Sequence, residues 1–106
     1  VINAPEGWRL DKMGQWISPL EVVRGGGRFL HAVQSGARVE DGTVSFAFES
    51  LDAPLIAPGM PRLLYADDLQ PQLDHGMHVL LYDNVWGTNF PMWYEEDAAF
   101  RFVLRL

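Results

Sequence analysis

The stretch T-V-S-F-A-F-E, residues 43–49, decides the fold class of this chain. Its apolar residues recur at every second position, and successive side chains of a β-strand point to opposite faces, so this pattern predicts a strand with one apolar face. The Asp-Gly pair at residues 41–42, just before it, is typical of a tight turn. We therefore predict an antiparallel hairpin whose two strands cover residues 29–39 and 43–50.

Two runs in the second half also predict strands. Residues 77–82 read M-H-V-L-L-Y, an apolar run short enough to favour a strand over a helix. At the C-terminus, apolar residues alternate with arginines over residues 100–106: one face holds Phe100, Phe102, Leu104 and Leu106, and the other holds Arg101, Val103 and Arg105. This alternation predicts a half-buried strand whose arginines face water or a partner.

The rest of the chain contains little that favours helices. Ten glycines and seven prolines interrupt it, and no window shows the 3.6-residue period of an amphipathic helix. Residues 51–76 and 83–98 are long irregular segments. Residues 1–27 contain few strand-like runs, and we expect their apolar side chains Trp8, Leu10 and Ile17 to cover a sheet edge. The sum is one all-β domain over residues 1–106, an antiparallel β-sandwich of four to seven strands.

Charge and composition exclude several classes of partner. The chain has 106 residues and a net charge of -6, whereas surfaces that bind phosphates are usually basic. We therefore predict no binding to nucleic acid or to anionic membranes. No run approaches the roughly 18 apolar residues of a membrane-spanning helix. The chain has no cysteine, which excludes disulfides, thiolate zinc sites and a cysteine nucleophile.

The densest group of polar and aromatic side chains falls in residues 81–94. Aromatic rings stack on the C–H faces of sugars, and amides and carboxylates bond sugar hydroxyls, so this composition is typical of a carbohydrate site. A second interpretation stays open, in which Trp86 and Phe90 attach the loop to the core and the two asparagines, Asn84 and Asn89, bond turn backbone. The candidate carbohydrate-contact residues are Asp83, Asn84, Trp86, Asn89, Phe90 and Trp93.

Other residue patterns give weaker indications of chemistry. His75 and His78 form an H-x-x-H spacing, but a strand would place them on opposite faces, so we predict no metal site. His31 falls in a strand-like run, and we expect a partly buried, hydrogen-bonded side chain. Asp52 and Asp83 are the acids considered for paired-carboxylate catalysis, although spacing alone does not place them opposite one another.

Three segments together resemble a known family. Residues 84–93, N-V-W-G-T-N-F followed by P-M-W, resemble a stretch near the C-terminus of proteins related to glycoside hydrolase family 38, the α-mannosidase-like enzymes. Residues 50–55, S-L-D-A-P-L, resemble a second stretch of these proteins, and W-R-L at residues 8–10 resembles part of the segment before it. The resemblance covers most of the chain in order and is strongest to a bacterial and fungal branch of glycosyl hydrolases.

The resemblance implies a supporting role. In that family the zinc ion and the catalytic carboxylates belong to an N-terminal α/β domain, and a C-terminal β-sandwich packs on it and lends loops to the substrate cleft. The chain begins at Val1, and we expect a non-catalytic C-terminal fragment without a cofactor of its own, whose partner is the catalytic domain of the same polypeptide. The motif positions that carry over are Asn84, Trp86, Asn89 and Phe90.

Two other functions stay open. The same aromatic and amide residues are compatible with an independent carbohydrate-binding module. Alternatively, the chain is a purely structural or interaction domain, in which Arg101 and Arg105 mark an interdomain face. In that case we expect the isolated chain to self-associate through an exposed strand edge or apolar face.

Overall fold

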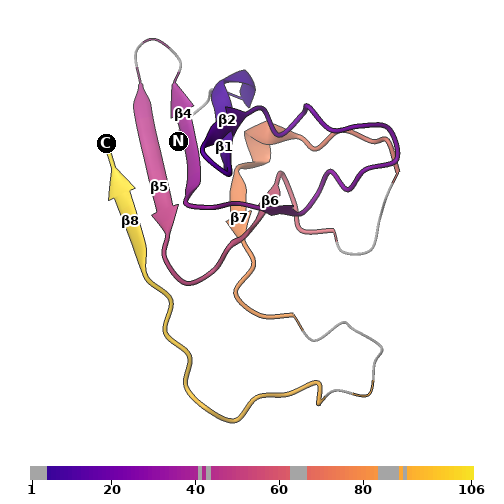
Figure 1. Cartoon of the computed structure of the whole chain (residues 1–106), viewed down its shortest axis with the longest axis vertical. Helices are drawn as coiled ribbons and strands as arrows, with labels where there is room; N and C mark the ends of the chain where they lie inside the picture. Colours follow the sequence, from indigo (N-terminus) through magenta and orange to yellow (C-terminus); the bar gives the residue numbers. More distant parts are fainter. Residues whose placement is uncertain (1–4, 41, 43, 63–66, 84–88, 90) are drawn as a thin grey trace.

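The computed structural model describes residues 5–40, 42, 44–62, 67–83, 89 and 91–106, which form two antiparallel sheets (Figure 1). The five-stranded sheet has the order β2-β1-β4-β5-β8 and the three-stranded sheet has the order β3-β6-β7. The strands are β1 (Trp8–Lys12), β2 (Gln15–Ile17), β3 (His31–Ala32), β4 (Gly36–Glu40), β5 (Ser45–Ser50), β6 (Leu55–Pro58), β7 (Met77–Val79) and β8 (Phe102–Arg105). Two short 3-10 turns, η1 (Pro5–Gly7) and η2 (Leu73–His75), accompany them. The predicted all-β sandwich is confirmed.

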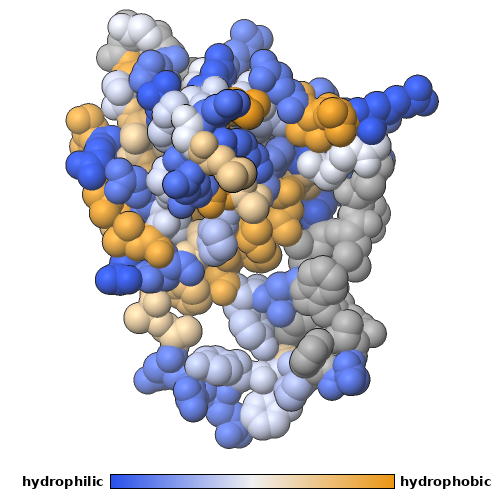
Figure 2. Space-filling model, viewed as in Figure 1, coloured by the Kyte–Doolittle hydropathy of each residue, from blue (hydrophilic) through white to orange (hydrophobic). Residues whose placement is uncertain are grey.

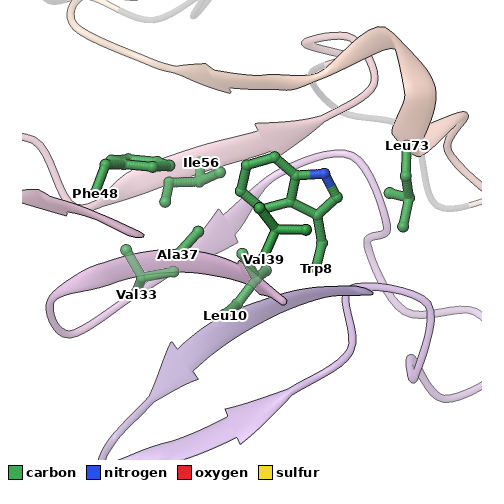
Figure 3. Close-up of a cluster of buried hydrophobic side chains, with 8 residues drawn as sticks. All are labelled: Trp8, Leu10, Val33, Ala37, Val39, Phe48, Ile56 and Leu73. Carbon is green, nitrogen blue, oxygen red and sulfur yellow. The ribbon is translucent and has the colours of Figure 1, made fainter. Parts of the chain in front are cut away.

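The core lies between the two sheets. Side chains from both sheets and from the segments beside them meet there, and Val39 and Ile56 are completely buried (Figure 3). Burial of this apolar surface is the main favourable term that holds the sheets together. The cluster consists of Trp8, Leu10, Val33, Ala37, Val39, Phe48, Ile56 and Leu73.

The predicted hairpin is confirmed in its second strand and wrong in the extent of its first. β4 and β5 pair antiparallel, with Ala37 opposite Phe48. Residues 29–39, however, do not form one strand, because β3 belongs to the three-stranded sheet and β4 to the five-stranded sheet. Between them the chain crosses from one sheet to the other, where the Val33 N–H donates to the Pro54 carbonyl and the Gln34 N–H to the Asp11 carbonyl.

The expectation that residues 1–27 only cover a sheet edge is wrong. β1 and β2 form a hairpin, and β1 lies inside the sheet between β2 and β4. Its turn contains Met13 and Gly14, both with positive φ, and the Gly14 N–H donates to Asp11 Oδ1 at 2.7 Å. Because β1 is an inner strand, Trp8 becomes part of the core.

The C-terminal strand exists, but its predicted half-burial is wrong. Phe102 is 40% exposed, Leu104 is 66% exposed and Leu106 is fully exposed. The cause is the unequal size of the two sheets, since β8 is the last strand of the wider one. The strand count is also higher than predicted, with eight strands in the described part of the chain. Of the predicted strand at residues 77–82, only β7 is regular.

Candidate carbohydrate-contact loop

The predicted site falls in residues 80–101, the segment between β7 and β8, called here the long loop, whose described part extends away from the sandwich (Figure 1). Three of the six candidate residues are described. Asp83 is half-buried, whereas Asn89 and Trp93 are exposed. The other three candidates, Asn84, Trp86 and Phe90, lie outside the described residues.

Both ends of the long loop are bonded to residues 51–55, which comprise the short connection after β5 and the first residue of β6. At the start, the Leu80 N–H donates to the Leu55 carbonyl at 3.0 Å. At the end, the Leu51 N–H donates to the Arg101 carbonyl, also at 3.0 Å. The S-L-D-A-P-L segment therefore closes the base of the loop.

Ser50 and Asp52 give this base its rigidity. The buried Ser50 hydroxyl donates to the Ala53 carbonyl at 2.5 Å and accepts from the Ala53 N–H at 3.3 Å. Asp52 accepts three bonds from Arg101, from the backbone N–H at 2.8 Å, Nε at 2.9 Å and Nη2 at 2.7 Å. Paired guanidinium bonds of this kind fix both distance and orientation.

The bonds to Arg101 also decide what Asp52 can do chemically. The side-chain bonds from Arg101, followed by its backbone N–H bond, lower the pKa of Asp52 from 3.8 to about 2. A general acid at neutral pH needs a raised pKa and a proton to give. Asp52 is therefore ionised at neutral pH and does not fit the role of a general acid, and the considered pairing of Asp52 with Asp83 stays a prediction.

The far part of the long loop presents aromatic side chains to solvent. Trp93 is 66% exposed and Tyr94 is 60% exposed. The Tyr94 hydroxyl donates to Glu96 Oε2 at 3.2 Å, which places a carboxylate beside Tyr94. In Figure 2, open space separates the body of the sandwich from the loop below it. The exposure of Trp93 favours the ligand-facing interpretation, whereas Trp86 and Phe90, the rings expected in the other interpretation to attach the loop to the core, lie outside the described residues.

An apolar groove opens between the sheets near the base of the loop, and the sequence did not predict it. It has a volume of about 410 Å³ and is bounded by strands β1, β5, β7 and β8. Finding it requires the pairing of strands that are distant in sequence. Its lining, which defines the apolar groove below, is Trp8, Phe46, Phe48, Met77, Val79, Leu81, Phe102 and Leu104.

A second polar cluster connects residues 24–28 to residues 67–70. Arg28 is buried, and its Nη2 lies 3.3 Å from Asp68 Oδ1. The Gly25 N–H donates to the same oxygen at 2.8 Å, and this bond, followed by the one from Arg28, lowers the pKa of Asp68. These bonds hold two irregular segments against each other and give the cluster a structural role.

The histidines also make structural contacts. His31 is buried and its Nε2 lies 3.0 Å from the Arg28 carbonyl, as predicted, and burial lowers its pKa. His75 ends η2 and is exposed, whereas the His78 ring lies in β7, 3.3 Å from the Gly59 carbonyl. Within the described ranges, no three His, Asp or Glu side chains lie close enough together to hold a metal ion. The same residues include no helix with the length and hydropathy to cross a membrane.

The fold and the long loop together define a class of protein, a small antiparallel β-sandwich that carries one long loop with exposed aromatic residues. No protein-family model, curated protein or solved structure matches the chain.

Proposed function

We propose that this chain is a non-catalytic β-sandwich domain of a glycosyl hydrolase, which supports the catalytic domain and contributes the long loop to its carbohydrate cleft. The observation on which this rests is the exposure of Trp93 and Tyr94 beside Glu96, on a loop whose base is fixed by the Asp52–Arg101 bonds. Exposed flat rings next to a carboxylate supply the stacking and hydrogen bonding that sugars need. The resemblance of residues 84–93 to the α-mannosidase-like enzymes supports the same assignment.

The first test of this proposal is an activity assay of the purified chain with aryl α-mannosides, with and without added zinc. We expect no hydrolysis above the blank, because in the family that the chain resembles the zinc ion and the catalytic carboxylates belong to a separate N-terminal domain. A rate that rises in proportion to protein concentration would show that the chain is catalytic by itself and would contradict the proposal.

The second test addresses the loop. We expect manno-oligosaccharides to bind weakly, with heat detectable by calorimetry only at millimolar sugar, because one stacking platform buries little ligand surface. Trp93→Ala should abolish this heat. Trp16→Ala is the matched control, because Trp16 is also exposed but lies on β2, where the Arg38 guanidinium stacks 4.4 Å from its ring centroid. Equal loss of heat in both variants would remove Trp93 from the proposed contact.

The same exposed rings also favour a second candidate function, an independent carbohydrate-binding module. The two differ in what the isolated chain should do. An independent module should bind sugar in the micromolar range without any partner, whereas a domain that only lends a loop should bind it only in the millimolar range. A complete absence of heat at millimolar sugar would end the module hypothesis.

A further inference from the structure

The outer edge of β8 has free backbone hydrogen-bonding groups. β8 ends the five-stranded sheet, and among the described residues only β5 pairs with it. The Leu51 N–H donates to the Arg101 carbonyl, so Arg101 directs its backbone toward β5. Because these directions alternate along an antiparallel strand, Val103 also faces β5, whereas Phe102 and Leu104 present their N–H and C=O groups to the outside. Two donors and two acceptors are thus available to another strand.

The two faces of this edge differ sharply in chemistry. On one face, Phe102 and Leu104 form the open rim of the apolar groove. On the other face, the side chains of Arg101 and Arg105 are 72% and 64% exposed. Each arginine pairs with a carboxylate on its inner side, Asp52 for Arg101 and Glu49 for Arg105. A strand placed outside β8 would therefore meet apolar groups on one face. On the other face it would meet the exposed side chains of Arg101 and Arg105, which are paired with Asp52 and Glu49 on their inner side.

We propose that the outer edge of β8 binds an extended strand of another polypeptide segment, in which apolar side chains alternate with acidic ones. Its backbone would bond Phe102 and Leu104, as in other cases of strand addition to a sheet edge. Its apolar side chains would continue the rim of the groove, and its carboxylates would lie beside Arg101 and Arg105. This interaction is independent of any sugar binding by the long loop.

The charges argue against a second copy of the chain as the occupant. Two-fold antiparallel pairing of β8 with itself, centred on Val103, would place Phe102 opposite Leu104 of the second copy and Arg101 opposite its Arg105. Like charges directly opposite one another destabilise a strand pair. An acidic strand instead places its carboxylates opposite Arg101 and Arg105 and avoids this like-charge pairing.

The direct test uses the 106-residue chain and a capped peptide of eight residues in which valine alternates with glutamate. At low salt we expect amide hydrogen exchange to slow at Phe102 and Leu104, with little change at Val103, whose N–H already faces β5. A peptide with lysine in place of glutamate should bind about tenfold more weakly, because attractive cross-strand pairs become repulsive ones. Equal binding of the two peptides, or protection elsewhere than at Phe102 and Leu104, would overturn the proposal.

Substitutions at Leu104 separate the backbone from the side chain. Leu104→Pro removes one outward N–H and keeps the bonds to β5, and proline is tolerated on an edge strand where the N–H faces solvent. We expect it to weaken binding of the glutamate peptide about tenfold or more. Leu104→Ala keeps the N–H and should weaken binding much less. Similar affinities for these two variants would show that backbone pairing at this edge is not the mode of binding.

Arg105→Gln provides a test that does not depend on how well a proline variant folds. It removes one charge from an exposed side chain, so we expect about two- to fivefold weaker binding of the glutamate peptide and stronger relative binding of the lysine peptide. No change in this ratio would contradict the charge argument. Light scattering of the chain alone completes the test, because dimers that Leu104→Pro abolishes would identify a second copy as the occupant and overturn the proposal.

Discussion

The middle of this sandwich and its β8 edge use similar residues and reach opposite burial. In the middle, Leu10, Val39 and Ile56 are completely or almost completely buried between the sheets. At the β8 edge, the apolar face of the strand stays open, with Leu104 66% exposed. The five-stranded sheet is wider than the three-stranded sheet, and the open apolar groove lies between β8 at its margin and β7. Apolar alternation thus identifies the apolar face of a strand, whereas burial depends on what lies across from it.

The largest expected difference between the middle of the sandwich and its β8 edge is in the free energy of unfolding that is lost when an aliphatic side chain is removed. Ile56→Ala should lower the free energy of unfolding by about 2–5 kcal/mol, because it leaves a cavity between the sheets. Leu104→Ala should change it by only about 0.5 kcal/mol, the usual range for an exposed position. Urea unfolding of both variants measures the difference. Similar losses would mean that the apolar face of β8 is covered in solution, which would contradict its exposure in the structure.

A smaller effect is expected where the long loop joins the sandwich. The Ser50 hydroxyl is buried and bonds both the N–H and the carbonyl of Ala53. Ser50→Ala leaves these groups without a partner and should cost about 1–2 kcal/mol in unfolding free energy. Ser45→Ala, at the exposed start of the same strand, is the control and should cost less than about 0.5 kcal/mol. Equal effects would show that the hydroxyl does not hold the base of the loop.

Sequence reasoning predicted the elements of this fold whose patterns are local. The alternation over residues 43–50 was sufficient for β5 and its pairing with β4, because side-chain period and turn chemistry are properties of neighbouring residues. It failed at residues 29–39, where one apolar run supplies strands to two sheets. The switch depends on backbone bonds from Val33 and Gln34 to distant residues, which no local pattern contains.

The candidate site divides in the same way. The clustering of aromatic and amide residues is a local pattern, and it was sufficient to identify the long loop, on which Trp93 is exposed. The pairing of Asp52 with Arg101 was not predicted, since 49 residues separate them. The apolar groove was missed for the same reason, because its lining comes from four separate strands. Long-range pairing, more than residue type, limited the prediction.

The Asp52–Arg101 bonds predict that the free energy of unfolding depends on pH. Because this ion pair is exposed, we expect the change with pH to be smaller than the loss caused by Ser50→Ala. The folded-state pKa of Asp52, about 2, lies below its ordinary value of 3.8. Between these two pH values the unfolded chain binds more protons, so the stability from this pair is complete above pH 3.8 and is lost as pH falls through about 2. Asp52→Asn should flatten the unfolding free energy over this range.

The flattening should be partial, because the pKa of Asp68 is also lowered, first by the Gly25 N–H and then by Arg28, and it contributes in the same direction. Asp97→Asn is the matched control, since Asp97 lies on the exposed part of the long loop and forms no ion pair with the described residues. Thermal unfolding at several acidic pH values measures all three proteins. A profile of Asp52→Asn that follows the unsubstituted chain would mean that the bonds to Arg101 are absent in solution.

The smallest expected effect on stability belongs to Trp93, and its small size is informative. Trp93→Ala should change the unfolding free energy by no more than about 0.5 kcal/mol, because the ring is 66% exposed. Trp16→Ala should cost more, since it also removes a cation–π contact with Arg38 worth about 0.5–1 kcal/mol. If Trp93 contributes less to the free energy of folding than Trp16 does, its ring makes few contacts with the protein and is available for a ligand. If Trp93→Ala costs more than Trp16→Ala, the Trp93 ring packs on the protein, and its proposed contact with carbohydrate fails.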